Sequence, residues 1–235
     1  MAQGFGVGLR DAWLDLVLGG TCAGCERPGR GLCRDCRAEL AALTPFAAVP
    51  APVPAGFPGA TACAPYDGML RRLIVEHKEH ARYSLAEPLG RTLAVAVAEA
   101  IAPGRAVWLC PIPSAAATVR ARGHEPLRRI AIVAARHLRA DGYDVRLADA
   151  LRLLRRPADQ AGLSARERAV NLEGVFAVRS RWAETLTDQR VLLVDDVLTT
   201  GSTLTQAAGA LETTGIAVFG AAVLAATRRR VVPGS

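Results

Sequence analysis

Short apolar runs alternate with segments of helical periodicity along most of this 235-residue chain. Consecutive apolar residues flanked by turn residues predict strands at 60–65, 107–110, 147–154, 177–178 and 217–226. Apolar residues that recur every three or four positions predict helices at 8–18, 69–78, 85–101 (with Ser84 as its N-cap) and 126–139. Strands that alternate with helices indicate an α/β fold with a mainly parallel sheet flanked by helices.

The sharpest change of pattern lies in residues 191–205, VLLVDDVLTTGSTLT. Its four leading apolar residues predict a buried parallel strand, which then gives way to a polar loop. From Ser202 the apolar spacing becomes helical, and Gly215 stands where such a helix would end. The unit is therefore a strand, a loop and a helix, with the loop at the carboxyl end of the strand, where open α/β sheets bind ligands.

The residue types of this loop suit two parts of one ligand. Hydroxyl and glycine residues at a helix N-terminus can surround one phosphate with N–H and O–H groups; they are Thr199, Thr200, Gly201, Ser202 and Thr203. Asp195 and Asp196 would repel that phosphate and suit sugar hydroxyls, or a metal that bridges them. A 5'-phosphorylated ribose satisfies both. The alternative is an acidic strand end before a capped helix, and no lysine follows the glycine as a P-loop requires.

Four of the six cysteines form two C-x2-C pairs separated by seven residues: Cys22, Cys25, Cys33 and Cys36. This spacing lets four thiolates close around a tetrahedral Zn²⁺, and the site is structural because no coordination position stays open. Two unrelated thiol pairs are the alternative, and a redox pair lacks its usual βαβ context. Cys63 and Cys110 stand in apolar strand patterns, so we expect them to be buried and without a role.

Composition divides the chain into four parts: an N-terminal helix and finger (1–43), a Pro/Ala-rich linker (44–59), a main domain (60–230) and a tail (231–235). The net charge of +7 favours anionic partners such as phosphorylated substrates or nucleic acid. No run approaches the roughly 20 apolar residues of a membrane span, so we expect no membrane insertion. We expect a cytoplasmic protein, in which cysteines bind metal or stay free.

Two polar segments carry further candidate residues. Arg120 and Arg122 follow two prolines after the 107–110 strand, and such a rigid loop can place guanidinium groups against a diphosphate. A solvated basic loop is the alternative there. Residues 156–164 begin a polar, Gly-containing stretch that predicts a lid ordering on ligand binding. Candidate substrate contacts in and after this lid are Arg156, Gln160, Arg168 and Asn171.

The 191–205 stretch resembles the PRPP-binding motif of type I phosphoribosyltransferases, which it matches at every defined position. Other motifs occur in order with it: the four-cysteine finger, Tyr-Asp-Gly before a helix ending at Lys78, Pro-Ile-Pro before R-x-R-G, and R-x3-Q-x2-L-S-x3-R-x2-N-x4-F over 156–176. Together they make the chain similar, over 22–226, to the ComF family of competence-associated proteins, which have a zinc finger and a phosphoribosyltransferase domain. One departure is His124-Glu125-Pro126, where that family often has an aromatic residue, Asn and Gln.

The resemblance implies a type I phosphoribosyltransferase fold and PRPP as the ligand. The loop Thr199–Thr203 would bind the 5'-phosphate, the two aspartates would bind the ribose, and Mg²⁺ would neutralise the diphosphate. Arg120, Arg122 and Lys78, the single lysine of the chain, are the candidates to stabilise the departing diphosphate. Together with Asp195 and Asp196 they form the expected catalytic set, and a nitrogen acceptor would capture C1.

Two further functions remain open from the sequence. One is an accessory of DNA uptake that binds single-stranded DNA, with vestigial or regulatory PRPP binding, although the chain shows no aromatic stacking platform. The other is a nucleotide-sensing regulator on the same fold. Proteins of this fold often dimerise, so a homodimer is also among the expected partners.

Overall fold

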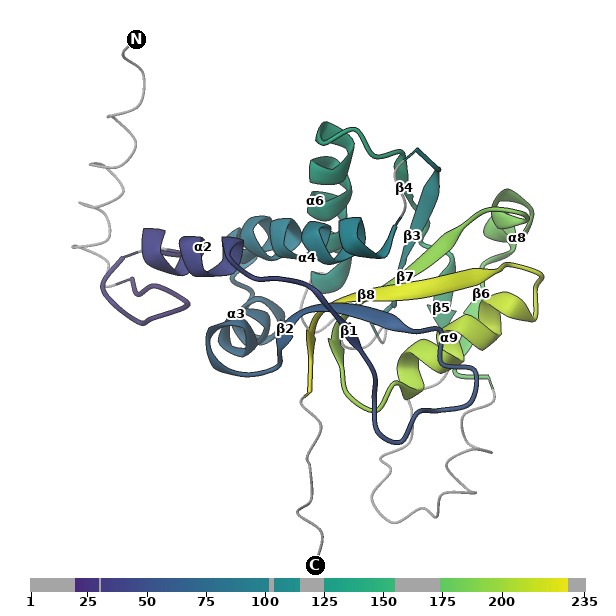
Figure 1. Ribbon diagram of the computed structural model, residues 1–235, viewed down its shortest axis with the longest axis horizontal. Coiled ribbons are helices and arrows are strands. Elements are labelled where there is room, and N and C mark those ends of the chain that lie inside the picture. The colour runs from purple at the N-terminus through teal and green to yellow at the C-terminus, as the bar shows by residue number, and fades with distance from the viewer. Residues whose placement is uncertain (1–19, 30, 102–103, 115–124, 155–173, 228–235) are drawn as a thin grey trace, which may run out of the picture.

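The computed structural model describes residues 20–29, 31–101, 104–114, 125–154 and 174–227. Its centre is a six-stranded sheet with the order β1-β2-β8-β7-β3-β4 (Figure 1). The strands are β1 (Phe46–Ala48), β2 (Ala60–Pro65), β3 (Val107–Pro111), β4 (Val145–Leu147), β7 (Val191–Leu198) and β8 (Val218–Ala226). Only β1 runs antiparallel to its neighbour. The expected mainly parallel α/β sheet is confirmed.

Strand β7 is buried on both faces, as its unbroken apolar start predicts. Residues 191–194 are fully buried, and Leu193 pairs with Cys110 of β3 on one side and Ala221 of β8 on the other. Strand β8 is rich in alanine, and its last seven residues are buried. Such small side chains let the covering helices approach the sheet closely.

Helices cover the sheet from two sides. They are α3 (Gly68–Glu79), α4 (Ala86–Ala100), α6 (Pro126–Ala140) and α9 (Ser202–Glu212). Helix α4 contacts β2 and β8, and α6 contacts β3 and β4. Helix α9 contacts β7 and β8 from the side of β8 opposite α4 (Figure 1). The chain thus leaves β3 and β7 toward opposite sides, which opens a crevice at the carboxyl ends of these neighbouring strands.

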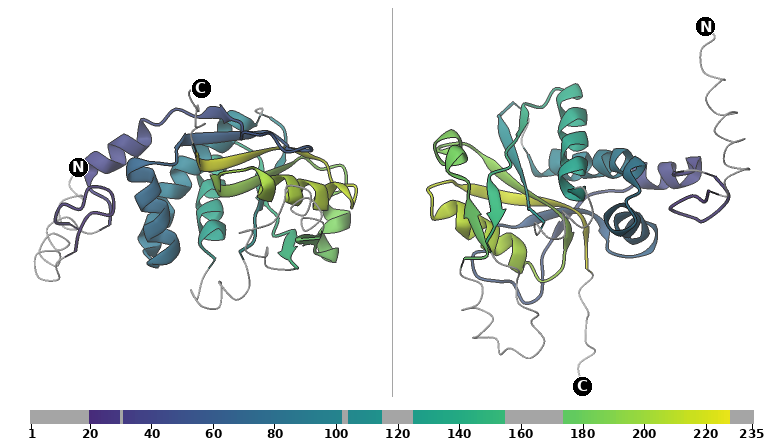
Figure 2. Two further views of the ribbon diagram at one scale, coloured as in Figure 1. Left: turned by 90° about the horizontal axis from the view of Figure 1, so that it is seen from below. Right: turned by 180° about the vertical axis from the view of Figure 1, so that it is seen from behind.

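The finger packs at one end of the molecule, whereas the linker runs from it to the start of α9 (Figure 1). Helix α2 (Arg34–Ala41) lies against α4, on the side away from α8 (Figure 2). The Arg82 guanidinium donates a hydrogen bond to the carbonyl of Thr21 in the finger at 3.3 Å. Within the segment expected to be a linker, β1 pairs with β2, Phe46 opposite Ala62. The segment therefore adds an edge strand to the sheet, while the four-part division of the chain stays a prediction.

Several element predictions needed correction. The strand expected at 147–154 is two strands, because β4 ends at Leu147 and β5 (Leu151–Leu153) pairs with β6 (Phe176–Val178) in a separate sheet. Between them the Asp149 carboxylate forms an ion pair with Arg128 of α6 at 3.0 Å. Strand β7 runs past the acidic pair to Leu198 rather than stopping before it.

The helix starts also differ in places from the expectation. A 3-10 turn, Tyr83–Leu85, precedes α4, so Ser84 does not cap that helix. The short helix α8 (Ser180–Leu186) was not predicted. Gly215 has the expected left-handed φ, +79°, just after α9. The helix predicted at 8–18 lies outside the described residues, and no described helix is long and apolar enough to cross a membrane.

Close packing of α4 on α6 depends on Gly90. A Cβ there would lie 2.5 Å from Cβ of Val133 and 2.9 Å from the carbonyl oxygen of Ile130. Gly209 in α9 has no atom within 4 Å of the equivalent position. One helical glycine is thus required by its neighbours and the other is not.

We predict that Gly90→Ala lowers the free energy of unfolding by about 1–3 kcal/mol, because the added methyl group forces α4 and α6 apart. The matched variant Gly209→Ala should raise it by about 0.5–1 kcal/mol through helix propensity. Urea unfolding followed by circular dichroism measures both. Equal effects of the two substitutions would contradict the close contact at Gly90.

Candidate functional site

The loop between β7 and α9 has the geometry of an anion site. Gly201 is the N-cap of α9 with φ +78°, a left-handed conformation that glycine adopts without strain. The hydroxyl of Thr200 donates to the Ser202 hydroxyl at 3.2 Å and accepts from the Ser202 N–H at 3.4 Å. Thr199, Thr200 and Thr203 are exposed. The loop therefore presents hydroxyl groups at the N-terminus of a helix, where backbone amides favour an anion.

A cavity of about 450 Å³ opens beside this loop. Its walls come from the carboxyl ends of β2, β3 and β7 and from parts of α3, α6 and α9. Contributing side chains include Tyr66, Lys78, Ser114, Asp195, Asp196 and Thr203. The cavity thus occupies the crevice between β3 and β7 that the topology predicts.

Asp195 is poorly solvated and carries an unusual pKa. The surrounding protein shields the carboxyl from water, and repulsion by Asp196 adds to this, so that the pKa of Asp195 rises to about 8. Its Oδ1 accepts the backbone N–H of Asp196 at 2.8 Å, which offsets the shift only in part. Asp195 therefore holds its proton more tightly than an ordinary aspartate does.

Lys78 bridges the cavity from α3. Its Nζ donates to Oδ2 of Asp196 at 2.7 Å, and the two side chains are 37% and 17% exposed. The sequence singled out both residues but did not pair them. Their contact places a cation and an acceptor carboxylate in the same cavity, so the site can bind both phosphate oxygens and hydroxyl groups.

Other candidates cannot be placed. Arg120, Arg122 and His124 of the loop after β3 lie outside the described residues, as do the lid residues Arg156, Gln160, Arg168 and Asn171. Their roles stay predictions. Ser114 and Tyr66 line the cavity without having been proposed as site residues. The signal for Ser114 was its place at the end of a strand, and Tyr66 belongs to the Tyr-Asp-Gly motif.

The four finger cysteines come together as their spacing predicts. All four Sγ atoms lie within 4.8 Å of one another, with Cys22 to Cys36 at 3.9 Å and Cys25 to Cys33 at 3.7 Å. A tetrahedron with metal–sulfur bonds of about 2.3 Å has sulfur–sulfur edges of about 3.8 Å. The donor set and its dimensions therefore fit one Zn²⁺.

Local geometry favours a thiolate at one of the four cysteines, Cys22. Burial acts to raise the pKa of Cys22, but backbone amides of Cys33, Cys25 and Gly24 outweigh it and bring the value to about 6. Burial raises the pKa of Cys36, which a bound cation would reverse. Gly24 is required here, since a Cβ would lie 2.7 Å from Sγ of Cys36. In contrast, burial raises the pKa of both Cys63 and Cys110 to about 12, in keeping with their expected inert burial.

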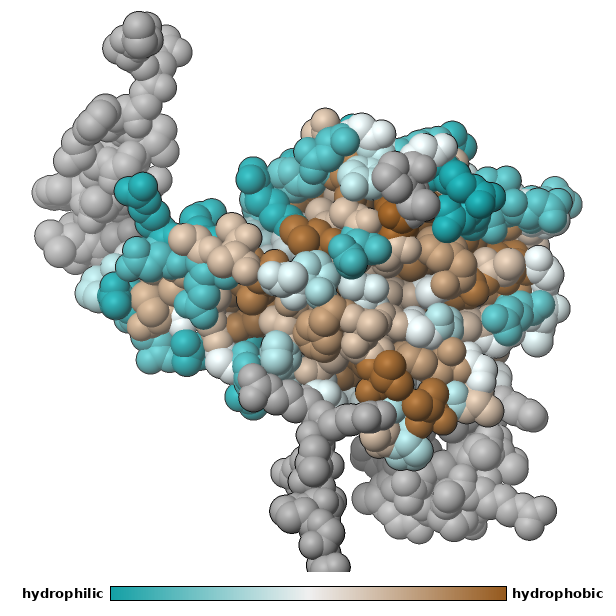
Figure 3. All heavy atoms as spheres, in the orientation of Figure 1, coloured by the Kyte–Doolittle hydropathy of each residue, from teal (hydrophilic) through white to brown (hydrophobic). Residues whose placement is uncertain are grey.

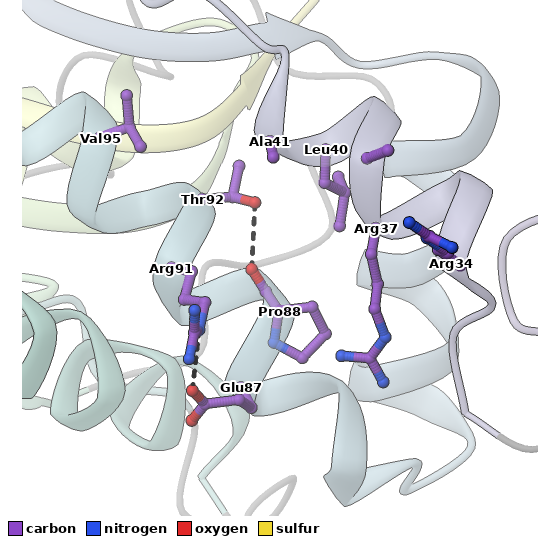
Figure 4. A pocket seen from close by; sticks show the side chains of 10 residues that line it. Arg34, Arg37, Leu40, Ala41, Glu87, Pro88, Arg91, Thr92 and Val95 are labelled. Carbon is purple, nitrogen blue, oxygen red and sulfur yellow. Dashed lines mark hydrogen bonds and ion pairs between the residues drawn. The ribbon is translucent and has the colours of Figure 1, made fainter. Parts of the chain in front are cut away.

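A larger cavity, about 610 Å³, lies between α2 and α4 (Figure 4). Two pairs of its polar groups bond to each other. Arg91 donates to Glu87 at 3.0 Å, and the Thr92 hydroxyl donates to the Pro88 carbonyl at 3.0 Å. His137 and nearby arginines lower the pKa of Glu87 to about 2. The smaller cavity at β7 instead joins the acidic pair, Lys78 and the hydroxyl-rich loop, so we assign the site to it.

We predict that the purified protein holds one Zn²⁺ per chain and that Cys33→Ser loses it. Three remaining thiolates bind the metal far less well, and the finger should lose its fold locally. Elemental analysis measures the metal. Cys63→Ser, outside the finger, is the matched control and should retain full zinc content, and zinc retained in Cys33→Ser would refute the assignment.

We also predict a pH-dependent effect of Asp195→Asn on stability. The pKa of Asp195, about 8, lies above the ordinary value of about 3.9, so the folded protein loses stability as the pH rises between them. Asparagine removes this loss. The variant should be about 1–3 kcal/mol more stable than wild type at pH 9, and nearly equal to it at pH 4.

Urea unfolding at the two pH values measures this difference. The control is Asp188→Asn, an exposed aspartate whose replacement should change stability little at either pH. A stabilisation by Asp195→Asn that is the same at pH 4 and pH 9 would contradict the raised pKa.

Comparison with known proteins agrees with this site. Residues 119–234 match the family model described as "Phosphoribosyl transferase domain", which spans just under half of the chain. No match was found among curated proteins. The matched region includes β7, the loop after it and α9. This part of the chain is therefore similar to phosphoribosyl transferase domains.

Proposed function

We propose that the protein binds PRPP together with Mg²⁺ and transfers its phosphoribosyl group to a nitrogen acceptor. The observation that carries the proposal is the arrangement at the end of β7. There an anion-binding loop, an acidic pair and Lys78 face one cavity at the carboxyl edge of a parallel sheet. The phosphoribosyl transferase domain supports it.

Each part of the ligand has a matching part of the site. The 5'-phosphate would bind the amides and hydroxyls of Thr199–Thr203 at the start of α9. The ribose hydroxyls would donate hydrogen bonds to the carboxyl groups of Asp195 and Asp196. These new bonds would replace the ones that the two carboxyl groups accept now. Mg²⁺, when bound with the ligand, would supply positive charge to the diphosphate.

Lys78 would take part in the chemical step. Cleavage of the bond between C1 and the diphosphate oxygen leaves that electron pair on the diphosphate and positive charge on the ribose ring. The acceptor nitrogen forms the new bond to C1 and gives up a proton. The ammonium of Lys78, already in the cavity, would turn from Asp196 to the diphosphate and stabilise the growing negative charge. Arg120 and Arg122 would assist from the loop after β3.

The sequence motifs support a place in the ComF family, and with it the finger as a zinc site. The departure at His124-Glu125-Pro126 stands in the loop that would meet the acceptor. We therefore propose that the acceptor differs from that of relatives with the usual pattern. The acceptor itself would be found by screening purines, pyrimidines and other amines for diphosphate release from PRPP.

A second candidate function, binding of single-stranded DNA, is favoured by one surface feature. Arg152, Arg179 and Arg181 surround a cavity of about 370 Å³ together with Val178 and Ser180. All three arginines are exposed. Such a cluster suits backbone phosphates, whose binding depends on positive charge and falls with salt.

Titrations with PRPP plus Mg²⁺ and with single-stranded DNA at fixed salt separate the two candidates. We predict that Asp195→Asn/Asp196→Asn weakens PRPP binding at least tenfold, because charge-assisted hydrogen bonds contribute about 1.5–3 kcal/mol each. DNA binding should stay equal or become slightly tighter, since negative charge is lost from the acidic pair.

The matched control is Arg152→Gln/Arg181→Gln, which should weaken DNA binding and leave PRPP binding unchanged. Unchanged PRPP affinity in the aspartate double variant would remove the ribose assignment. A wild-type protein that binds DNA but no PRPP would replace the transferase by the second candidate.

A further inference from the structure

The Pro/Ala-rich segment after β1 crosses directly behind the phosphate loop. A Cβ at Gly201 would lie 2.9 Å from Cγ of Pro50 and 3.1 Å from Cδ2 of Phe57. These two side chains therefore rest against the Cα of the glycine that starts α9. Pro50 is buried and Phe57 is half-buried against the core.

The contact continues along the start of α9 and onto β8. A Cβ at Gly56 would lie 3.8 Å from Cγ2 of Thr205, one turn into the helix. The carbonyl oxygen of Pro58 would lie 3.9 Å from a Cβ at Gly220 of β8. The N–H of Phe57 donates to the carbonyl of Pro54 at 3.1 Å, which folds the segment into a turn.

Both ends of this segment are fixed to the sheet. Before it, β1 pairs with β2, and after it the chain enters β2 itself. Figure 3 shows an apolar patch on the surface over the segment, where Val49 and Val53 are 50% and 54% exposed. The segment thus has an outer apolar side facing solvent and an inner side, with Pro50 and Phe57, facing the loop.

We infer that Pro50 and Phe57 are positioning residues for the phosphate loop. Glycine has more backbone freedom than any other residue type. The φ of +78° at Gly201 is therefore one of several values that this residue can adopt. Two packed rings behind its Cα restrict it to the conformation in which the following amides converge. The loop then binds a phosphate without first having to order itself, and such preorganisation increases affinity.

This inference rests on the proposed function, because it assigns the loop to the 5'-phosphate of PRPP. It predicts an effect on one part of the ligand only. The 5'-phosphate lies on the loop, whereas the diphosphate would lie near Lys78 and Mg²⁺. A residue that supported the fold in general would weaken both parts alike.

The test is Phe57→Ala, titrated with three probes: PRPP plus Mg²⁺, ribose 5-phosphate, and inorganic diphosphate plus Mg²⁺. We expect the Kd values of PRPP and ribose 5-phosphate to rise about tenfold and that of diphosphate to change less than about twofold. Phe57→Leu, which refills most of the space, should recover most of the lost affinity. Val53→Ala, on the exposed side of the same segment, should match wild type with all three probes.

The outcomes distinguish a failure of the positioning role from a failure of the proposed function. Ribose 5-phosphate binding by Phe57→Ala at the wild-type level would overturn the positioning role. Equal losses for all three probes, with a lower Tm, would also overturn it by showing general destabilisation. A wild-type protein that binds neither PRPP nor ribose 5-phosphate would refute the proposed function first. If Phe57→Ala does not fold, Pro50→Ala removes the ring atom nearest Gly201 and decides the question with the same probes.

Discussion

Two adjacent carboxyl groups at the end of a buried strand are the constraint on which this molecule depends. Strand β7 has hydrogen-bonded neighbours on both sides and contributes four fully buried residues to the core. The same strand carries Asp195 and Asp196 into a poorly solvated position, where two negative charges would repel each other. This repulsion raises the pKa of Asp195, and the ion pair of Asp196 with Lys78 offsets part of it. Ionisable groups whose environment shifts their pKa at the expense of stability cluster at functional sites.

The rest of the fold brings backbone segments unusually close. Only 5% of the residues are aromatic, so the core consists mainly of alanine, valine and leucine. Segments pack at short distances where large side chains are few. Examples are Gly90 between α4 and α6, Gly24 beside Cys36, and Gly201 against the linker. At each of these positions a methyl group would meet an atom at 2.9 Å or less. The molecule is thus sensitive to single added carbons at points far apart in the sequence.

Local patterns were sufficient to predict the elements that carry the site. The strand–loop–helix unit of β7 and α9, the cysteine cluster and the helix ending near Lys78 all follow from spacing over a dozen residues. Contacts between distant segments were not predictable in this way. Lys78 and Asp196 are 118 positions apart, and only the packing of α3 beside the end of β7 brings them together. Strand β1 has three residues in a proline-rich segment and shows no alternation, and β5 pairs with the distant β6 instead of continuing from β4.

The choice of cation opposite Asp196 agrees with a group that must change partners. Nearly every positive charge in the chain is arginine, yet the residue in the cavity is lysine. An arginine there would donate two parallel hydrogen bonds to the carboxylate in a fixed plane. A lysine ammonium makes a single contact on a flexible stem, and its three donors can turn to another acceptor without loss of a planar fit. The Lys78 side chain is 37% exposed, so an incoming anion can reach the ion pair from solvent. The Lys78–Asp196 ion pair is therefore suited to neutralising the carboxylate while leaving Lys78 able to move to a bound anion.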